Sequence, residues 1–182
     1  MLEFIREGFV PPPDNLFKVI DHNLGYFKNG EWKSCFVFGN TLANLELISS
    51  NPIQWLELIQ SLKSAGVVGC SLEHMSEGVE VPTHTDTDVL LDYPVIRMFY
   101  SLSSDNSFYF KGSVFSFSSH KFEEVELEEW KDFVMFSAHR DHSFKSHSDG
   151  YYFIIDLAQD PNKLDTRFWK HYLSLVLDNY VV

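Results

Sequence analysis

The feature that most constrains the fold is a succession of short segments with strand character between residues 67 and 157. Several of them alternate apolar and polar side chains, and clusters of Gly, Asn, Asp and Ser separate them, as is typical of half-buried strands joined by turns. The segments predicted to be strands are 67–73, 79–83, 95–102, 107–111, 114–117, 122–126, 133–136, 143–146 and 151–157. So many short strands in succession predict a mainly β fold, either a β-sandwich or a jelly-roll barrel.

Two segments outside this region have the spacing of helices. Asn51 and Pro52 indicate the N-cap and the first turn of one helix, and Gly66 marks its end. Asp160 and the proline after it indicate the start of a second helix, over about residues 161–178, in which apolar residues recur at helical spacing. The predicted architecture is therefore a β-sandwich or a jelly-roll barrel flanked by helices.

The N-terminal part of the chain is predicted to support the barrel with irregular structure and short strands. Asn29 and Gly30 indicate the turn of a hairpin between residues 25–28 and 31–33. No repeat, low-complexity tract or linker divides the 182 residues, so we expect a single domain over residues 1–182. Its expected parts are a support region at about 1–66, a jelly-roll core at about 67–158 and a C-terminal helix at about 161–178.

The charge balance excludes one class of partner. The chain has 14 Lys and Arg against 26 Asp and Glu, a formal net charge of −12, and no basic run. Nucleic-acid binding relies on clustered basic side chains, so we expect a small-molecule or peptide substrate and no nucleic acid.

Apolar stretches, the N-terminal segment and the cysteines indicate the cellular compartment. No apolar stretch approaches the roughly 18 residues of a membrane span, and the N-terminus does not resemble a secretory signal. The two cysteines, Cys35 and Cys70, are too few and too far apart for a disulfide framework or a metal finger, which favours a reducing compartment. We therefore expect a soluble, cytoplasmic protein that does not contact membranes, and the sequence carries no signal for an oligomeric state.

His84 and Asp86 form the first part of a candidate metal site. They follow the predicted strand 79–83, and residues i and i+2 of an extended segment point the same way, so both side chains can reach one ion. A third ligand has to come from farther along the chain, and His142 is the preferred histidine. Two histidines and one carboxylate form the facial triad of non-haem Fe(II) oxygenases, which leaves open positions on the metal. By itself, the short His-x-Asp pattern is more often a solvated turn or strand end.

Other side chains compete for these ligand positions. His139 and His147 lie near His142 in the sequence, and either of them could replace it. Asp88 is an alternative carboxylate at a less suitable offset, and His74 is more readily explained as a core or rim residue. Surface or packing roles are expected for His22, His120 and His171.

The surroundings of these candidate ligands resemble a known family. The segment Gly78-Val-Glu-Val-Pro-Thr-His-Thr-Asp is similar to the glycine turn, short strand and proline that precede the first ligand histidine in the aspartyl/asparaginyl β-hydroxylase branch of the Fe(II)/2-oxoglutarate-dependent oxygenases. The similarity continues, in the same order, in Val95-Ile-Arg-Met-Phe-Tyr-Ser-Leu, Phe133-Val-Met-Phe-Ser-Ala-His-Arg-Asp-His-Ser-Phe and Tyr151-Tyr-Phe-Ile-Ile-Asp-Leu. The matching elements cover roughly residues 67–157, about half of the chain.

The resemblance implies a double-stranded β-helix, the barrel of jelly-roll and cupin-like proteins, with Fe(II) bound by His84, Asp86 and His142. It implies 2-oxoglutarate and O2 as co-substrates, and hydroxylation of an unactivated C–H bond in an Asp-, Asn- or Pro-like side chain of an amino acid or peptide. Family members with Gly or Ala in place of the carboxylate have room for a halide, so Asp86 disfavours halogenation.

Arg97 is conspicuous because it lies in an otherwise apolar predicted strand. A buried guanidinium must be paired with an anion, which leaves two interpretations. Arg97 could form an ion pair with one of the many carboxylates of the chain. The resemblance favours the other interpretation, in which Arg97 binds the distal carboxylate of 2-oxoglutarate in a bidentate manner.

One departure from the family bears on the co-substrate. Many members carry an arginine shortly after the second ligand histidine, whereas residues 149–153 of this chain contain none. The hydroxyl of Tyr100 or Tyr152 could then assist Arg97 in binding the co-substrate. Further cationic side chains near the second histidine are Arg140 and Lys145. The missing arginine also leaves an alternative function, a non-catalytic jelly-roll module that binds a metal or a small ligand.

Overall fold

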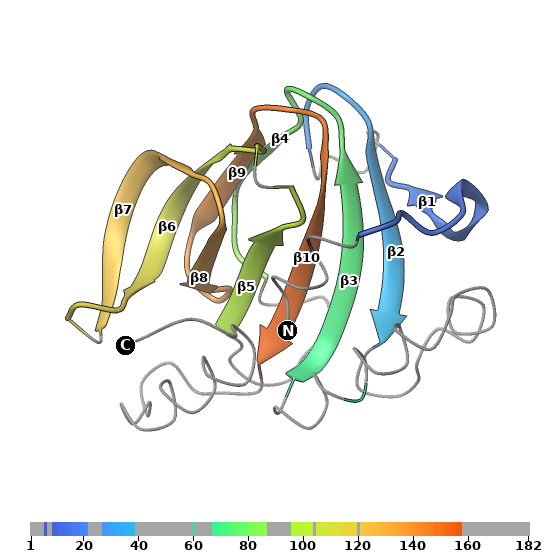
Figure 1. The fold of residues 1–182 in the computed structure, drawn as a ribbon. Coiled ribbons are helices and arrows are strands. Elements are labelled where there is room, and N and C mark those ends of the chain that lie inside the picture. The colour runs from blue at the N-terminus through green and yellow to red at the C-terminus, as the bar shows by residue number, and fades with distance from the viewer. Residues whose placement is uncertain are drawn as a thin grey trace.

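The described part of the chain is mainly β-structure (Figure 1). The computed structural model describes residues 6, 9–21, 27–38, 60, 67–86, 96–103, 105–119 and 121–157. The elements within these residues are the 3-10 turn η1 (Asp14–Leu16) and the strands β1 (Lys18–Val19), β2 (Trp32–Phe38), β3 (Val67–Met75), β4 (Glu80–His84), β5 (Ile96–Ser101), β6 (Phe108–Ser116), β7 (Lys121–Trp130), β8 (Phe133–Ser137), β9 (His142–Ser146) and β10 (Gly150–Leu157). The predicted mainly β fold class is confirmed.

The ten strands form one curled antiparallel sheet, a half-barrel, as Figure 1 shows. The strand order is β1-β2-β3-β10-β5-β8-β6-β9-β4, and β7 also pairs with β6. The last described strand, β10, therefore lies in the middle of the sheet, where it pairs with β3 on one side and β5 on the other. A curled antiparallel sheet whose neighbouring strands are far apart in the sequence is typical of jelly-roll barrels.

Alternation along the strands creates two apolar clusters on the two faces of the sheet. In β5, Met98 and Tyr100 belong to one cluster, whereas Phe99 belongs to the other. In β10, Phe153 belongs to the first cluster and Tyr152 to the second. We call the face that carries Phe99 and Tyr152 the Phe99 face. Arg97 lies two residues before Phe99 and therefore shares this face.

The turn predicted near the N-terminus has the expected conformation but not the expected partners. Asn29 and Gly30 have positive φ angles of 60° and 64°, as a tight hairpin turn of this type requires. The predicted hairpin itself is wrong, because Lys28 bridges to Glu80 and the strand after the turn, β2, pairs with β3. The turn therefore guides β2 into the main sheet.

Two further predictions differ from, or fall outside, what the structure describes. The predicted strands 107–111 and 114–117 form the single strand β6, whose register shifts between Phe110 and Gly112. The predicted helices at about 51–66 and 161–178 lie outside the described residues, except for residue 60, and stay predictions together with the single domain. Within the described ranges, no helix is long and apolar enough to cross a membrane.

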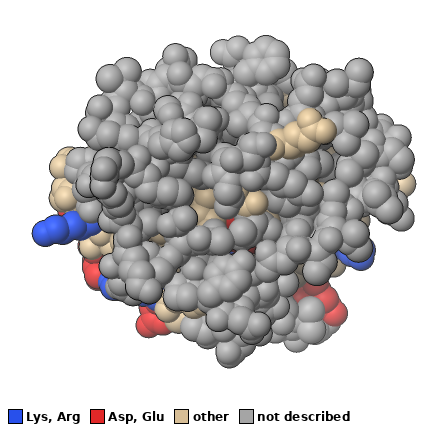
Figure 2. Space-filling view, turned by 90° about the horizontal axis from the view of Figure 1, so that it is seen from below, with Lys and Arg blue, Asp and Glu red and all other residues tan. Residues whose placement is uncertain are grey.

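Strand β7 carries a large share of the acidic residues. Five of its ten residues are Glu, and most of its side chains are exposed. Charged side chains on a strand of this kind disfavour pairing with another chain. On the face of the molecule seen in Figure 2, most of the visible described Lys, Arg, Asp and Glu side chains lie around the margin, and both signs of charge are present.

Candidate metal centre

The predicted ligands His84, Asp86 and His142 lie close together because β4 pairs with β9. His84 is the last residue of β4, His142 is the first residue of β9, and the two are register partners. The Asp86 N–H donates to the carbonyl oxygen of Ala138 (2.9 Å), which holds the segment after β4 against the turn before β9. One potential ligand atom from each of the three side chains lies within 4.8 Å of the others.

Each oxygen of the Asp86 carboxylate faces one histidine. The distance from Oδ1 to His84 Nε2 is 3.3 Å, and the distance from Oδ2 to His142 Nε2 is 3.6 Å. The two imidazole rings are 4.3 Å apart between centroids. Two ring nitrogens and one carboxylate therefore point to a common centre, an arrangement that suits a divalent transition metal.

Backbone carbonyls orient both imidazoles. His84 Nδ1 lies 2.8 Å from the carbonyl oxygen of Pro82, and His142 Nδ1 lies 2.8 Å from that of Arg140. A carbonyl oxygen only accepts hydrogen bonds, so both Nδ1 atoms carry a proton, and both Nε2 atoms face Asp86, where each can offer a lone pair to a metal once it is unprotonated. Metal-ligating histidines characteristically have their other ring nitrogen held in this way. These residues fit a metal ion.

The protonation states also suit metal binding. Burial lowers the pKa of His142 to about 4, so this imidazole is neutral at neutral pH. Burial opposes ionisation of Asp86, but the hydrogen bond with His84 and the charge of Arg97 lower the pKa of its carboxyl overall. The hydrogen bond to Asp86 raises the pKa of His84. The neutral His142 and the ionised Asp86 are thus in the forms that bind a metal, and protonation of His84 competes with metal binding.

A small cavity of about 60 Å³ adjoins the triad on the Phe99 face. Apart from His84, His142 and Arg97, the described residues that line it are apolar: Trp32, Met75, Val81, Phe99, Phe110, Phe136, Phe144 and Ile154. The rings of Phe136 and Phe110 pack near the His142 ring, with centroid distances of 4.8 and 6.2 Å. Such walls exclude water from a metal-bound reactant.

Arg97 forms two ion pairs beside this cavity. Its Nε donates to Asp156 Oδ1 (2.7 Å) and its Nη2 donates to Asp156 Oδ2 (3.0 Å), so that the pair is bidentate. Its Nη1 donates to Asp86 Oδ2. Burial opposes the charge of Arg97, but the two carboxylates raise its pKa overall. Of the two interpretations that the sequence left open, the structure shows the ion pair, and binding of a co-substrate by Arg97 stays a prediction.

The two predicted tyrosines lie on opposite faces of the sheet. Tyr152 is buried on the Phe99 face, where its hydroxyl lies 3.4 Å from Ser146 Oγ and burial raises its pKa. Tyr100 lies in the other cluster, with the Arg6 guanidinium 5.5 Å from its ring centre. Successive residues of a strand alternate in direction, so Tyr100 cannot share a face with Arg97. The structure therefore does not bring Tyr100 to the triad, and a co-substrate role for Tyr152 stays a prediction.

The alternative ligands lie elsewhere or outside the described residues. Within those residues, neither His139 nor His147 belongs to the group of potential metal ligands that contains His142. His147 is exposed, with its ring centre 5.8 Å from that of Tyr109. Asp88 falls outside the described residues. The remaining positions are as follows: His74 Nε2 lies 3.1 Å from Asp149 Oδ1, Arg140 Nη1 lies 3.2 Å from Glu124 Oε1, and Lys145 is exposed.

Two buried carboxylates were not among the predicted site residues. One is Asp156, the partner of Arg97, and the other is Glu73, which accepts hydrogen bonds from Trp32 Nε1 (2.6 Å) and Ser34 Oγ (2.9 Å). Burial raises the pKa of Glu73. A signal for both was available, because each is the single acidic residue of a mainly apolar strand.

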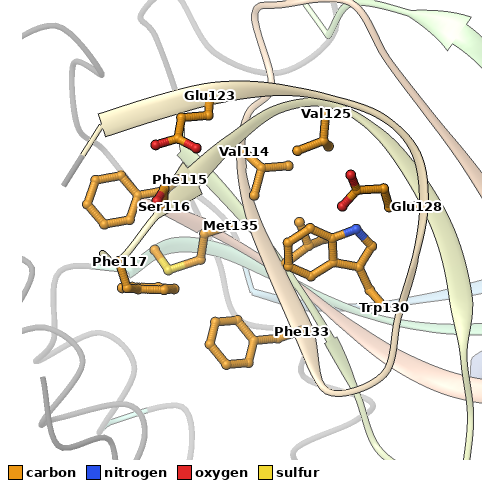
Figure 3. Close-up of a pocket in the computed structure, with 11 residues that line it drawn as sticks. Val114, Phe115, Ser116, Phe117, Glu123, Val125, Glu128, Trp130, Phe133 and Met135 are labelled. Atoms are coloured by element: carbon orange, nitrogen blue, oxygen red, sulfur yellow. The ribbon is translucent and has the colours of Figure 1, made fainter. Parts of the chain in front are cut away.

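A larger cavity of about 260 Å³ lies between β6, β7 and β8 (Figure 3). The Trp130 ring and the side chains of Phe115, Phe117 and Phe133 line it, together with the carboxylates of Glu123 and Glu128. This cavity shares no residue with the triad, and none of the predicted site residues lines it.

Comparisons with known proteins give only distant structural likeness. No family model matches the chain, and no curated protein matches it in sequence. Similar solved structures include a predicted oxalate decarboxylase from Thermotoga maritima (12% identity, TM-score 0.42, covering 82% of this chain and 100% of that chain). Another is an acetylacetone dioxygenase from Acinetobacter johnsonii (8% identity, TM-score 0.40, covering 92% of this chain and 91% of that chain). A third is a Pseudomonas putida prolyl-4-hydroxylase (10% identity, TM-score 0.38, covering 87% of this chain and 82% of that chain). We therefore base the function on the geometry of the site.

Proposed function

We propose that this protein is a non-haem Fe(II)-dependent oxygenase whose metal is held by His84, Asp86 and His142. The main support for the proposal is that one nitrogen from each of the two imidazoles and one carboxylate oxygen lie within 4.8 Å of one another. Two histidines and one carboxylate are the ligand set of non-haem Fe(II) oxygenases. When bound, such an ion supplies the activation of O2 for oxidation of a C–H bond.

The surrounding residues prepare the site for this ion. The carbonyl oxygens of Pro82 and Arg140 fix the two imidazoles so that their lone pairs face the metal position. Burial keeps His142 neutral, and the ionised Asp86 supplies the negative charge. The apolar walls of the adjoining cavity keep water away from the reacting groups.

The family resemblance makes 2-oxoglutarate the co-substrate to test first, together with O2. Its distal carboxylate requires a cationic or hydroxyl partner, and Arg97 is the one cationic side chain among the described residues that line the cavity. Arg97 is held by Asp156 and Asp86, so it does not fit an anchoring role in this conformation, and we derive no step through 2-oxoglutarate. The same pairing favours a second candidate, an Fe(II) oxygenase that does not use 2-oxoglutarate.

We further propose that the oxidised group is the side chain of an amino acid or a peptide. The resemblance implies an Asp-, Asn- or Pro-like side chain. The described lining of the cavity offers hydrocarbon and aromatic surface, and a carboxylate or amide would lose its hydrogen bonds to water there. This composition favours the Pro-like side chain among the three.

Anaerobic titration with Fe(II) tests the metal site, and His84→Ala and Asp86→Ala should abolish binding that the wild-type protein shows. His147→Ala, which removes an exposed histidine outside the triad, is the matched control and should bind Fe(II) normally. Absence of Fe(II) binding by the wild-type protein would overturn the proposal.

Addition of 2-oxoglutarate and then O2 to the Fe(II)-loaded protein separates the candidate functions. A visible absorption band on anaerobic addition, followed by succinate formation with O2, supports 2-oxoglutarate dependence. O2 consumption without succinate supports the second candidate. Fe(II) binding without O2 consumption, with or without 2-oxoglutarate and proline-containing peptides, supports the non-catalytic metal-binding module instead.

A further inference from the structure

Arg97 and Asp156 are joined in a geometry that fixes the guanidinium. They are register partners on the neighbouring central strands β5 and β10, so their backbones are held by the sheet. Two parallel N–H···O bonds of 2.7 and 3.0 Å connect them. Both side chains are largely buried, with 15% and 11% of their surface exposed. A bidentate arginine–aspartate pair with little solvent is strongly directional.

The remaining nitrogen of the guanidinium reaches the candidate metal ligand. Arg97 Nη1 donates to Asp86 Oδ2, while Asp86 Oδ1 faces His84 Nε2. The terminal torsion of an aspartate is broad, and Asp86 follows the end of β4, so the strand does not by itself fix its carboxylate. The hydrogen bond from Arg97 restrains the carboxylate at Oδ2, while His84 faces Oδ1.

Asp156 also affects the charge at the site. A cation in contact with a metal ligand weakens the binding of a second cation by electrostatic repulsion. The carboxylate of Asp156 offsets the charge of Arg97, so Arg97 can orient Asp86 with less repulsion of a divalent ion. The chain of ion pairs from Asp156 through Arg97 to Asp86 therefore both orients the Asp86 carboxylate and balances the charge of Arg97.

We propose that Arg97 and Asp156 are positioning residues of the metal centre: Asp156 holds Arg97, and Arg97 holds the Asp86 carboxylate in its metal-binding orientation. This inference rests on the proposed function, because it requires a metal at the triad. In this role Arg97 binds the metal ligand Asp86 and does not bind the co-substrate. Outer hydrogen-bond partners of metal ligands typically change metal affinity by about 10–100-fold when they are replaced.

Affinity for Co(II) alone, measured by calorimetry and visible absorption, tests the inference without any turnover. Arg97→Gln and Asp156→Asn should each raise the Kd for Co(II) by about 10–100-fold and change the Co(II) absorption spectrum. If Arg97 acted only through its charge, Arg97→Gln would bind Co(II) more tightly, because it removes a cation. The direction of this change therefore separates positioning from simple electrostatics.

Arg6→Gln is the matched control, because it breaks another arginine–aspartate ion pair, between Arg6 and Asp132 at 2.9 Å. Arg6 packs over the ring of Tyr100, which belongs to the apolar cluster on the face opposite the triad. Arg6→Gln should leave the Kd for Co(II) unchanged. Circular dichroism and thermal unfolding establish that each variant is folded. If Arg97→Gln does not fold, Arg97→Lys carries the test, since it keeps the charge, loses the bidentate geometry and should still weaken Co(II) binding.

The outcomes distinguish this inference from the proposed function. Suppose that the wild-type protein binds Co(II). Equal or tighter Co(II) binding by folded Arg97→Gln, or unchanged binding by Arg97→Lys, would then overturn the positioning role alone. Wild-type protein that does not bind Co(II) or Fe(II) would overturn the metal centre and the inference with it. Weaker binding by both the Arg97 and Asp156 variants, with normal binding by Arg6→Gln, establishes the positioning role.

Discussion

The buried imidazole of His142 should make the metal-free protein sensitive to mild acid. Burial lowers the pKa of His142 from its ordinary value of 6.5 to about 4 in the folded protein. Between these two values the unfolded chain binds a proton that the folded protein does not. The free energy of unfolding therefore falls as the pH falls through this window, whereas above pH 6.5 His142 contributes little to its pH dependence.

The size of the effect follows from the difference in pKa. For values of 6.5 and about 4, the free energy of unfolding should drop by about 2 kcal/mol between pH 7 and pH 5, and by about 3 kcal/mol at pH 4. His84 works in the opposite direction, because the Asp86 hydrogen bond raises its pKa and protonation at mildly acidic pH is compatible with the folded state. Asp86 stays ionised across the window because its pKa is lowered.

Urea unfolding of the wild-type protein and of His142→Asn, with a chelator present, measures this contribution. The asparagine amide can still donate to the carbonyl of Arg140, but it does not titrate. The stability difference between the two proteins should shift by about 2 kcal/mol in favour of the variant between pH 7 and pH 5. His147→Asn makes the same substitution at an exposed histidine outside the triad and is the control. A stability difference that is independent of pH would refute the assignment of a buried, neutral imidazole to His142.

Three other outcomes are expected. Gly150→Ala would place a Cβ atom 1.7 Å from Asn106 Nδ2 and should lower the free energy of unfolding by about 1–3 kcal/mol in urea. Trp32→Phe removes a hydrogen-bond donor from the buried Glu73 carboxyl, and should cost about 1–3 kcal/mol in urea at pH 7 and less at pH 5. Cys70 is buried, and burial raises the pKa of its thiol, so a thiol reagent should label it rapidly only after unfolding.

Each of these outcomes has its own control. Asn106→Ala should restore most of the stability lost in Gly150→Ala, and failure to do so would contradict a steric cause. Trp130→Phe removes an indole whose N–H has no hydrogen-bond partner within the described residues, so it should lack the pH dependence of Trp32→Phe. The pH dependence of Trp32→Phe arises because the pKa of Glu73 is raised, so its ionised carboxylate becomes unfavourable in the folded state as the pH rises. Rapid labelling of Cys70 in the native protein would contradict its burial.

Local patterns in the sequence were sufficient to predict most of the strands. Period-two alternation and turn residues located the strands from β3 to β10, because both depend on residues close together in the chain. The same patterns divided β6 into two strands, because Gly112 resembles a turn residue. In the fold, Gly112 makes room instead, since a Cβ there would lie 2.9 Å from the Cβ of His142. That close approach involves a neighbouring strand, β9, and cannot be seen in the local sequence.

The triad was within reach of the sequence because two of its members share one extended segment. His84 and Asp86 are separated by one residue, and His142 follows an apolar strand that the family resemblance also contains. The choice of His142 over His139 and His147 was an inference from that resemblance. In the structure, the register of β4 and β9 brings His142 beside His84, which spacing alone does not require.

The sequence by itself therefore determined the mainly β fold class, the turn conformation at Asn29 and Gly30, and the residue types available for a metal. Only the tertiary structure decided how the buried charges are paired. Arg97 and Asp156 are 59 residues apart, and Trp32 and Glu73 are 41 apart. These pairs form because strand order places β10 beside β5 and β3 beside β2. Strand order depends on packing of the whole sheet, so the partner of Arg97 could be required by the sequence but not identified from it.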